Sequence, residues 1–300
     1  MNMKKLLTFE DMGLVQWGVL NEEETGVYSA IALEEGFFTP LPETLLEFIR
    51  QGNDGLLALA DALEQNEKEG AIEAKLLDTI RILAPIPHVE RNIFCIGKNY
   101  TEHIVEFDKT TNPTIPKYPI IFTKATSSVI GPEDLINPHK NVTAELDYEG
   151  ELAVIIGKSD CDIPISEAMD YVYGFTILND VTARDLQRNH SQWFHGKSLD
   201  TFCPMGPYIL LRDAAPDTFD VITKVNNEVR QDGSTGEFIF TISQLITTIS
   251  QGTTLQAGDI IATGTPSGVG AGFNPPRYLH SGDCVEISIS GIGTLKNKIK

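Results

Sequence analysis

Three carboxylates spaced two residues apart stand directly before an apolar run in LDYEGELAVIIG, residues 146–157. They are Asp147, Glu149 and Glu151. On one strand such residues share a face and lie about 7 Å apart, so their charges repel each other. A solvated face would tolerate that repulsion. The run LAVIIG, however, predicts a buried strand, so at least some of the carboxylates at its start should be buried as well. A hard cation such as Mg²⁺, which prefers oxygen ligands, would reconcile burial with charge.

A further oxygen ligand is offered by Asp180 in ILNDVTARDLQ, where a strand-like run ends and a helical pattern begins. A plain turn aspartate is the alternative interpretation. Thr182 and Asp185 have the spacing of a capping box at the start of that helix. Arg184 and Gln187 are three residues apart and share a helix face, so both could lean over the same site. An arginine there could bind a carboxylate in a bidentate fashion.

An imidazole and a carboxylate are spaced at i and i+3 in IGKNYTEHIVEF, as His103 and Glu106 on a short helical turn. Such a pair can hold a water molecule and take its proton. The pattern H-x-x-E is weak by itself, because a surface histidine with a nearby glutamate also produces it.

The bulk composition limits the partners. The 300 residues include 42 acidic and 23 basic side chains, and the formal charge of -19 argues against nucleic acid or an anionic membrane surface as the main partner. An anionic ligand would need local positive charge. The N-terminal apolar run is cut short by Glu10 and Asp11, unlike a secretory signal, so we expect a cytoplasmic protein. Four scattered cysteines predict reduced, mostly buried thiols.

The glycines of IIATGTPSGVGAGFNPP follow a strand-like run, as in a phosphate-binding loop. Pro275 and Pro276, however, stand where the helix of a dinucleotide-binding fold should run. The chain also lacks the P-loop and the G-x-S-x-G motif of serine hydrolases. These glycines therefore predict a tight loop beside a ligand.

The elements that must position these side chains fall into two parts. Residues 1–83 predict a small α+β domain, with a hairpin around residues 21–26 and helical patterns in PETLLEFIRQG and DGLLALADALEQ. Two prolines in residues 84–87 predict a linker. Residues 84–300 contain many strand-like runs and few helical patterns, which predicts an α+β domain built around a rolled or sandwiched mixed sheet. The strand-like runs are NIFCIG, PIIFTK, ELAVIIG, YGFTILND, MGPYILL, DVITKVNN with EVRQ, GDIIATG and DCVEISISGIG.

The order of the motifs resembles that of the fumarylacetoacetate hydrolase (FAH) superfamily, in particular its acylpyruvate hydrolase and oxaloacetate decarboxylase branch. The motifs are GKNYTEH-x-x-E, LDYEGELAVIIG, NDVTARDLQ, GKSLDTFCPMGP and GDIIATGTPSGVG, and the resemblance runs from about Pro85 to the C-terminus. It implies an FAH-type mixed β-roll or sandwich core, and a homodimer. The superfamily also holds isomerases, hydratases and diketo-sugar-acid hydrolases, so the motifs specify the fold better than the substrate.

The resemblance also implies a role for each matching residue. The metal ligands, for Mg²⁺ or Mn²⁺, would be Glu149, Glu151 and Asp180, supported by Asp147. The catalytic residues would be His103 and Glu106, on a short lid-like helix, and Lys197 of GKSLD. The substrate-binding residues would be Arg184, Gln187, Thr265 and Lys124.

Together these features predict a divalent-metal enzyme that acts on small anionic 2-oxo acids. Oxaloacetate decarboxylation and C–C hydrolysis of acylpyruvates both release a pyruvate enolate, which the metal would stabilise as a Lewis acid. Lys197 could assist the first reaction, and a water activated by His103 and Glu106 would start the second. Two alternatives stay open: a 2-hydroxy-dienoate isomerase or hydratase of aromatic catabolism and, in a different class, a metabolite-binding scaffold protein.

Overall fold

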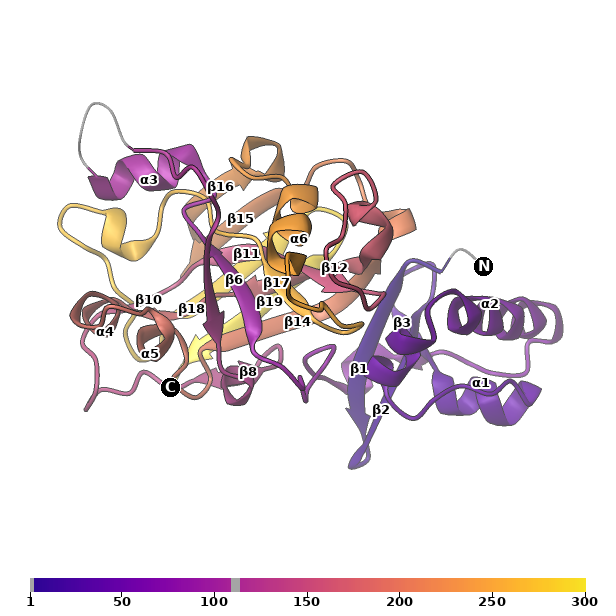
Figure 1. Ribbon diagram of the computed structural model, residues 1–300. Helices are drawn as coiled ribbons and strands as arrows, with labels where there is room; N and C mark the ends of the chain where they lie inside the picture. The colour runs from indigo at the N-terminus through magenta and orange to yellow at the C-terminus, as the bar shows by residue number, and fades with distance from the viewer. Residues whose placement is uncertain (1–2, 109–113) are drawn as a thin grey trace.

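Residues 3–108 and 114–300 are described by a computed structural model, shown as a ribbon in Figure 1. The α-helices of these residues are α1 Ala30–Phe37, α2 Leu45–Glu69, α3 Thr101–Asp108, α4 Arg184–Asn189, α5 Phe194–Lys197 and α6 Ile242–Ser250. The first strands are β1 Lys5–Asp11, β2 Leu14–Leu20, β3 Gly26–Ser29, β4 Lys75–Leu76, β5 Arg81–Ile82, β6 Ile93–Gly97, β7 Ile120–Lys124, β8 Val129–Ile130, β9 Leu135–Ile136 and β10 Leu146–Asp147. The later strands are β11 Gly150–Ile156, β12 Val172–Asn179, β13 Thr182–Ala183, β14 Cys203–Leu211, β15 Asp220–Val225, β16 Glu228–Ser234, β17 Ile260–Ala262, β18 Cys284–Ile289 and β19 Gly293–Ile299.

Two mixed sheets packed face to face form the body of the molecule. The larger has the strand order β4-β3-β2-β1-β14-β12-β11-β17-β6-β7, and the smaller has the order β16-β15-β18-β19-β9. One hydrophobic cluster joins them, with Val154 and Ile177 from the larger sheet and Val221 and Ile287 from the smaller. The predicted α+β class and its sandwiched mixed sheet are therefore confirmed, and each predicted strand-like run contains a strand.

The strands that carry the candidate site are buried on both faces. All residues of β11 and β12 are buried. The smaller sheet covers one face, while α2 packs in a second cluster with residues of the opposite face, such as Ile155 and Leu178. Strands covered on both sides read as continuous apolar runs, which explains the sequences LAVII and FTIL.

The N-terminal part continues the larger sheet, because β1 pairs with β14 and places Lys5 opposite Leu210. In Figure 1 it lies to one side of the sandwich, with α1 and α2 over β1–β3. The predicted hairpin joins β2 to β3, and the two predicted helical patterns form one helix, α2, with a kink at Gly52. The predicted linker, residues 84–87, is packed instead of exposed, with Ala84 and Ile86 buried. A domain boundary at residue 83 stays a prediction.

The cysteines were predicted to be reduced and mostly buried. All four cysteines are free thiols, of which Cys95 and Cys203 are buried, whereas Cys161 is exposed and Cys284 partly so. Within the two described ranges, no helix has the length and apolar character needed to cross a bilayer.

Candidate metal centre and active site

A buried cluster of carboxylates lies at the end of the larger sheet where β11 begins and β12 ends. Glu149 directly precedes β11, Glu151 lies in it, and Asp180 directly follows β12. Because these strands are antiparallel neighbours, the start of one lies beside the end of the other. One carboxylate oxygen from each of the three residues lies within 4.8 Å of the other two, and all three side chains are buried. The structure thus brings the predicted metal ligands together.

Asp147 does not share a strand face with these residues, so that part of the pattern-based prediction is wrong. Residues 148–149 separate two strands: β10, which contains Asp147, pairs with β13, while β11 pairs with β12. The Asp147 carboxylate accepts a hydrogen bond from Arg184 Nε at 2.8 Å. It also accepts the backbone N–H groups of Gly270 at 2.7 Å and Ala271 at 2.9 Å. Asp147 therefore holds an arginine and the glycine-rich loop in place, as a supporting residue would.

The predicted capping box before α4 is also wrong. The helix begins at Arg184, while Thr182 belongs to β13 and its hydroxyl donates to the backbone oxygen of Asp180 at 2.8 Å. The Asp185 carboxylate accepts from the Thr143 hydroxyl at 2.6 Å and from the Leu186 N–H at 2.8 Å, which are not the partners of the predicted box. The strand β13, which the sequence pattern did not reveal, contains Thr182, the residue that would have formed the cap.

Two buried cations hold Glu149 in place. Lys197 Nζ lies 2.7 Å from Glu149 Oε2 and 2.7 Å from Asp180 Oδ2, so it links two of the three carboxylates. Arg184 Nη1 lies 2.7 Å from Glu149 Oε1 and donates to Gln187 Oε1 at 3.2 Å. Burial alone would raise the pKa of Glu149, but the charges of Lys197 and Arg184 lower it below its usual value. Glu149 therefore keeps its negative charge.

The buried charges around the triad do not balance. The residues concerned are Asp147, Glu149, Glu151 and Asp180, and Lys124, Arg184 and Lys197. Four carboxylates thus face three cations. Glu151 has no ion-pair partner within residues 3–108 and 114–300, where it accepts only the backbone N–H of Gly264 at 2.8 Å. Burial, followed by the charges of Asp180 and Glu149, raises its pKa well above the usual value.

A divalent cation would remove this imbalance. Carboxylate oxygens are the ligands that Mg²⁺ and Mn²⁺ prefer in proteins. The residues present therefore fit the predicted cofactor, which Glu149, Glu151 and Asp180 would hold.

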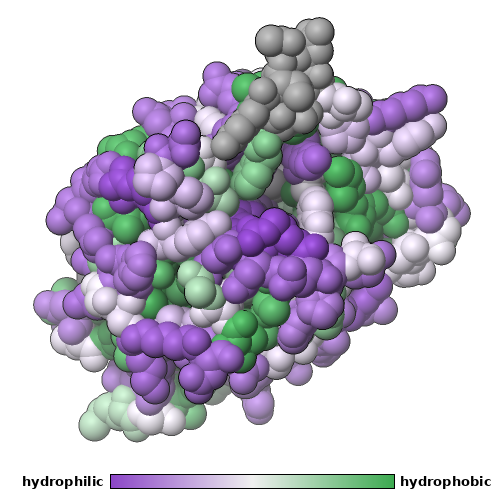
Figure 2. Space-filling model, turned by 90° about the vertical axis from the view of Figure 1, so that its left-hand side faces the viewer, coloured by the Kyte–Doolittle hydropathy of each residue, from purple (hydrophilic) through white to green (hydrophobic). Residues whose placement is uncertain are grey.

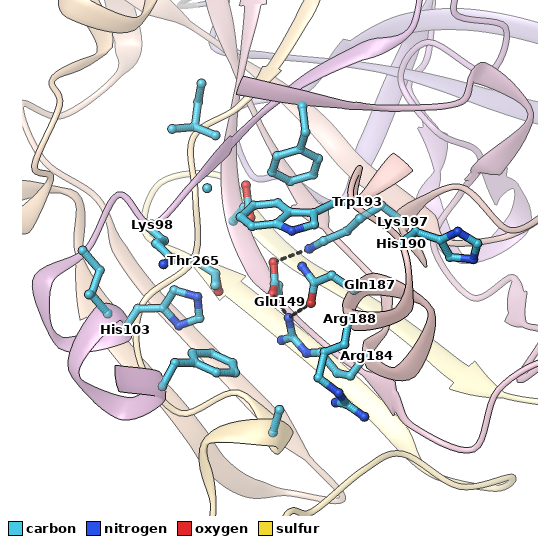
Figure 3. A pocket seen from close by; sticks show the side chains of 17 residues that line it. Lys98, His103, Glu149, Arg184, Gln187, Arg188, His190, Trp193, Lys197 and Thr265 are labelled. Carbon is cyan, nitrogen blue, oxygen red and sulfur yellow. Dashed lines mark hydrogen bonds and ion pairs between the residues drawn. The ribbon is translucent and has the colours of Figure 1, made fainter. Parts of the chain in front are cut away.

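A cavity of about 430 Å³ opens beside the triad. Its wall includes most of the residues predicted for catalysis and substrate binding, namely His103, Arg184, Gln187, Lys197 and Thr265. Two of the predicted metal ligands, Glu149 and Glu151, also line it. In Figure 3, His103 and Thr265 lie on one side of Glu149, and Lys197 lies on the other. Figure 2 looks on to the side of the molecule that carries α3, α4 and α5, which is mostly hydrophilic with scattered apolar residues.

Helix α3 positions the predicted catalytic pair at this cavity. His103 Nδ1 lies 2.6 Å from Glu106 Oε1, which leaves the other ring nitrogen, Nε2, available to a ligand. The second oxygen, Glu106 Oε2, accepts the backbone N–H of Gly268 at 2.9 Å. The ring of Phe107, one residue further along the helix, lies 5.5 Å from the guanidinium of Arg184. Glu106 thus orients the imidazole and also ties α3 to the glycine-rich loop.

The glycine-rich loop approaches its neighbours too closely for side chains at two positions. Gly268 has a φ of +102°, and a Cβ there would lie 1.9 Å from the carbonyl oxygen of Arg230. A Cβ on Gly272 would lie 2.3 Å from Glu106 Oε2. The loop also contributes Thr265 and Ala271 to the cavity wall. As predicted, the glycines form a tight loop next to the cavity.

We expect Gly272→Ala to lower kcat about 10- to 100-fold, because a catalytic group misplaced by about 1 Å can cost a factor of that size. The new Cβ would displace the Glu106 carboxylate and, with it, the imidazole of His103. The matched control is Gly236→Ala, whose Cβ would meet Thr218 at an ordinary 3.5 Å. Steady-state kinetics and thermal melts of both variants check the prediction, which fails if the two variants have the same kcat.

The two remaining predicted substrate contacts differ in position. Thr265 is buried at the cavity wall, where its hydroxyl donates to the Gly150 oxygen at 2.9 Å and accepts from Gln231 Nε2 at 2.7 Å. Lys124 is fully buried and is not among the residues that line the cavity. Its ammonium lies 2.5 Å from Asp180 Oδ1, so it neutralises this carboxylate from behind.

Aromatic and basic residues that the sequence analysis did not single out complete the wall. They include Lys98, Phe107, Phe122, Arg188 and Trp193. The rings of Phe122 and Trp193 pack edge to face with centroids 5.2 Å apart. Their positions near the motifs could have pointed to these residues, since Lys98 belongs to GKNY and Trp193 stands four residues before Lys197.

The fold is that of a known enzyme family. Residues 92–300 match the model of the fumarylacetoacetate (FAA) hydrolase C-terminal domain, and the chain belongs to the fumarylacetoacetate hydrolase family. It is 49% identical over 266 residues to the oxaloacetate tautomerase YisK of Bacillus subtilis, which covers 86% of this chain and 87% of that protein. The family membership predicted from the motif order is therefore confirmed.

Solved structures agree with this assignment over the whole chain. The fumarylacetoacetate hydrolase from the psychrophilic Exiguobacterium antarcticum has a TM-score of 0.81 and 42% sequence identity, with 99% of each chain covered. The 5-carboxymethyl-2-hydroxymuconate delta-isomerase from Mycobacterium smegmatis has a TM-score of 0.75 and 31% identity, with 98% of each chain covered. The family thus includes both hydrolases and isomerases on this fold.

Proposed function

We propose that this protein is a divalent-metal enzyme that interconverts the keto and enol forms of oxaloacetate. The observation that carries the proposal is the buried triad of Glu149, Glu151 and Asp180 in the same region as a cavity lined by His103. The Bacillus relative is named for oxaloacetate tautomerisation, which favours this reaction over the decarboxylation or hydrolysis expected from the motifs.

The cavity provides binding groups for a 2-oxo acid. A cation held by Glu149, Glu151 and Asp180 would supply a Lewis acid for negative charge on the keto oxygen. Arg184 Nη2 is buried and, among the described residues, has no hydrogen-bond partner. A substrate carboxylate would satisfy this donor, and a buried donor left unpaired is costly. Gln187, on the same face of α4, adds a side-chain amide at the cavity wall.

His103 is the group positioned to move the proton. Because Nδ1 is bonded to the Glu106 carboxylate, the neutral imidazole carries its proton there and presents Nε2 as a base. In enolisation Nε2 takes a proton from C3 of oxaloacetate, the C3–H electron pair forms the C2=C3 double bond, and the carbonyl electrons move to the C2 oxygen. The proton then returns to that oxygen. The reverse sequence gives the keto form, so no atom is gained or lost.

Decarboxylation of oxaloacetate is the second candidate. A cation held by the triad would stabilise an enolate whether it forms by loss of a proton or by loss of CO₂. Loss of CO₂ from C4 leaves the pyruvate enolate, with its charge on the same C2 oxygen. Acylpyruvate hydrolysis requires, in addition, a water activated by His103. Isomerisation of a 2-hydroxy-dienoate is favoured by the mycobacterial relative named as an isomerase.

The enol absorbance of oxaloacetate, followed with Mg²⁺, with Mn²⁺ and with EDTA, tests the proposal. We expect the enzyme to accelerate the decay of freshly dissolved enol in the presence of either metal, and EDTA to abolish the acceleration. Pyruvate should not accumulate beyond the control with free metal alone. Enzyme-dependent pyruvate at the rate of enol loss would instead make decarboxylation the main reaction. Failure with oxaloacetate would contradict the proposal, and failure with acylpyruvates and dienoates too would favour the scaffold alternative.

A further inference from the structure

Among the described residues, one lysine or arginine of the cavity wall has no acidic partner. The lysines and arginines of the wall are Lys98, Arg184, Arg188 and Lys197. Three of them form ion pairs of 2.7 Å with carboxylates of the protein. Across residues 3–108 and 114–300, no hydrogen bond or ion pair involves the ammonium of Lys98.

The backbone at Lys98 is held in a conformation that residues with side chains rarely adopt, with a φ of +58°. Both neighbours fix this turn. Gly97 ends β6 against the ring of Trp193, where a Cβ would lie 2.5 Å from Cζ3. Asn99 is fully buried, donates to the Phe240 oxygen at 3.2 Å and accepts the Phe240 N–H at 2.8 Å. The fold thus enforces the position of Lys98, although no other described residue pairs with its charge. Such enforced conformations concentrate at functional sites.

Lys98 lies across the cavity from Lys197. In Figure 3, Lys98 is on the same side of Glu149 as His103 and Thr265, while Lys197 is on the other side. A substrate with its reacting end beside Glu149 and Arg184 therefore has room to extend its other end towards Lys98. Because the protein carries a formal charge of -19, a second negative charge on that substrate needs a local cation.

We propose that Lys98 recognises the second carboxylate of a dicarboxylic 2-oxo acid and so selects oxaloacetate-like substrates over monocarboxylic ones. The inference rests on the proposed function, because it assumes a 2-oxo acid in this cavity. A charge-assisted hydrogen bond of this kind changes kcat/KM by about 10- to 100-fold. Lys98 is thus a specificity-determining residue, while His103 remains the base.

The test compares oxaloacetate with its C4 methyl ester, which keeps the C1 carboxylate and the keto group but lacks the second charge. kcat/KM for tautomerisation of both compounds is measured for the wild type, Lys98→Met, Lys98→Arg and Lys224→Met. Lys224 is an exposed lysine on β15 that does not line the cavity. We expect Lys98→Met to lower the ratio of oxaloacetate to ester by about 10- to 100-fold, mainly through KM. Lys98→Arg should restore most of the ratio, and Lys224→Met should not change it.

An unchanged ratio in Lys98→Met overturns the inference even if both rates fall, because a shared loss would mean that the lysine supports the turn instead of the second carboxylate. A wild-type enzyme that converts neither compound overturns the proposed function, and this inference with it. The two failures are distinguishable, since the first leaves wild-type turnover of oxaloacetate intact.

Discussion

Glu151→Gln is expected to abolish metal-dependent turnover, with kcat/KM lowered more than about 100-fold, because even the outer partners of metal ligands are worth about 10- to 100-fold. Glutamine keeps the size of the side chain but removes the charge that the cation needs. The fold should persist, since the amide can still accept the Gly264 N–H. Turnover and Mn²⁺ binding by calorimetry check the result, and unchanged activity would exclude Glu151 as a ligand.

The same variant should be more stable than the wild type when both are stripped of metal. In the metal-free wild type the buried Glu151 carboxylate has no ion-pair partner among the described residues. Burial and the charges of Asp180 and Glu149 raise its pKa. A neutral amide avoids that cost, so we expect the melting temperature to rise by about 2 °C or more. The matched control is Glu149→Gln, which deprives Lys197 and Arg184 of a partner and should lower the melting temperature. Shifts of the same sign in both variants would contradict this account of the charges.

His103→Ala is expected to lower kcat for oxaloacetate tautomerisation by about 10²- to 10⁴-fold, the usual contribution of a general base. Mn²⁺ binding should be unaffected, because the imidazole is not among the predicted ligands. If the wild type shows both side activities, acylpyruvate hydrolysis should lose more than oxaloacetate decarboxylation, since only hydrolysis requires an activated water. His280→Ala, at a histidine whose side chain is 82% exposed, serves as the control. Equal losses in hydrolysis and decarboxylation would show that the two reactions do not divide at this residue.

The parts of the site that sequence could predict are those encoded by spacing within a segment. Glu149 and Glu151 stand at the start of one apolar run and Asp180 at the end of another, and antiparallel pairing brings them together. The placement of Asp147 was wrong because it depends on the pairing of β10 with β13, which lies over 30 residues further along the chain. No local pattern encodes such a partner. That Lys98 has no partner in residues 3–108 and 114–300 likewise becomes visible only when the other cations of the cavity have been assigned partners.

The fold shows the same limit. Strands and the hairpin between β2 and β3 follow from alternation and turn residues, but α1 and the pairing of β1 with β14 were not predicted. That pairing joins Lys5 to Leu210, two segments whose separation in sequence exceeds the range of any periodic pattern. The homodimer and the cytoplasmic location implied by the sequence concern other molecules and compartments, and both stay predictions.

The pairing of β1 with β14 gives the N-terminal part a protective role for the catalytic part. β14 lies between β1 and β12, and β12 leads directly to Asp180. A protein truncated before residue 84 would leave the backbone N–H and C=O groups of β14 unpaired along the edge that β1 covers. An exposed strand edge of this kind recruits strands from other chains and promotes aggregation. We therefore expect the N-terminal part to act as an edge cap, and residues 84–300 alone to be less soluble than the whole chain.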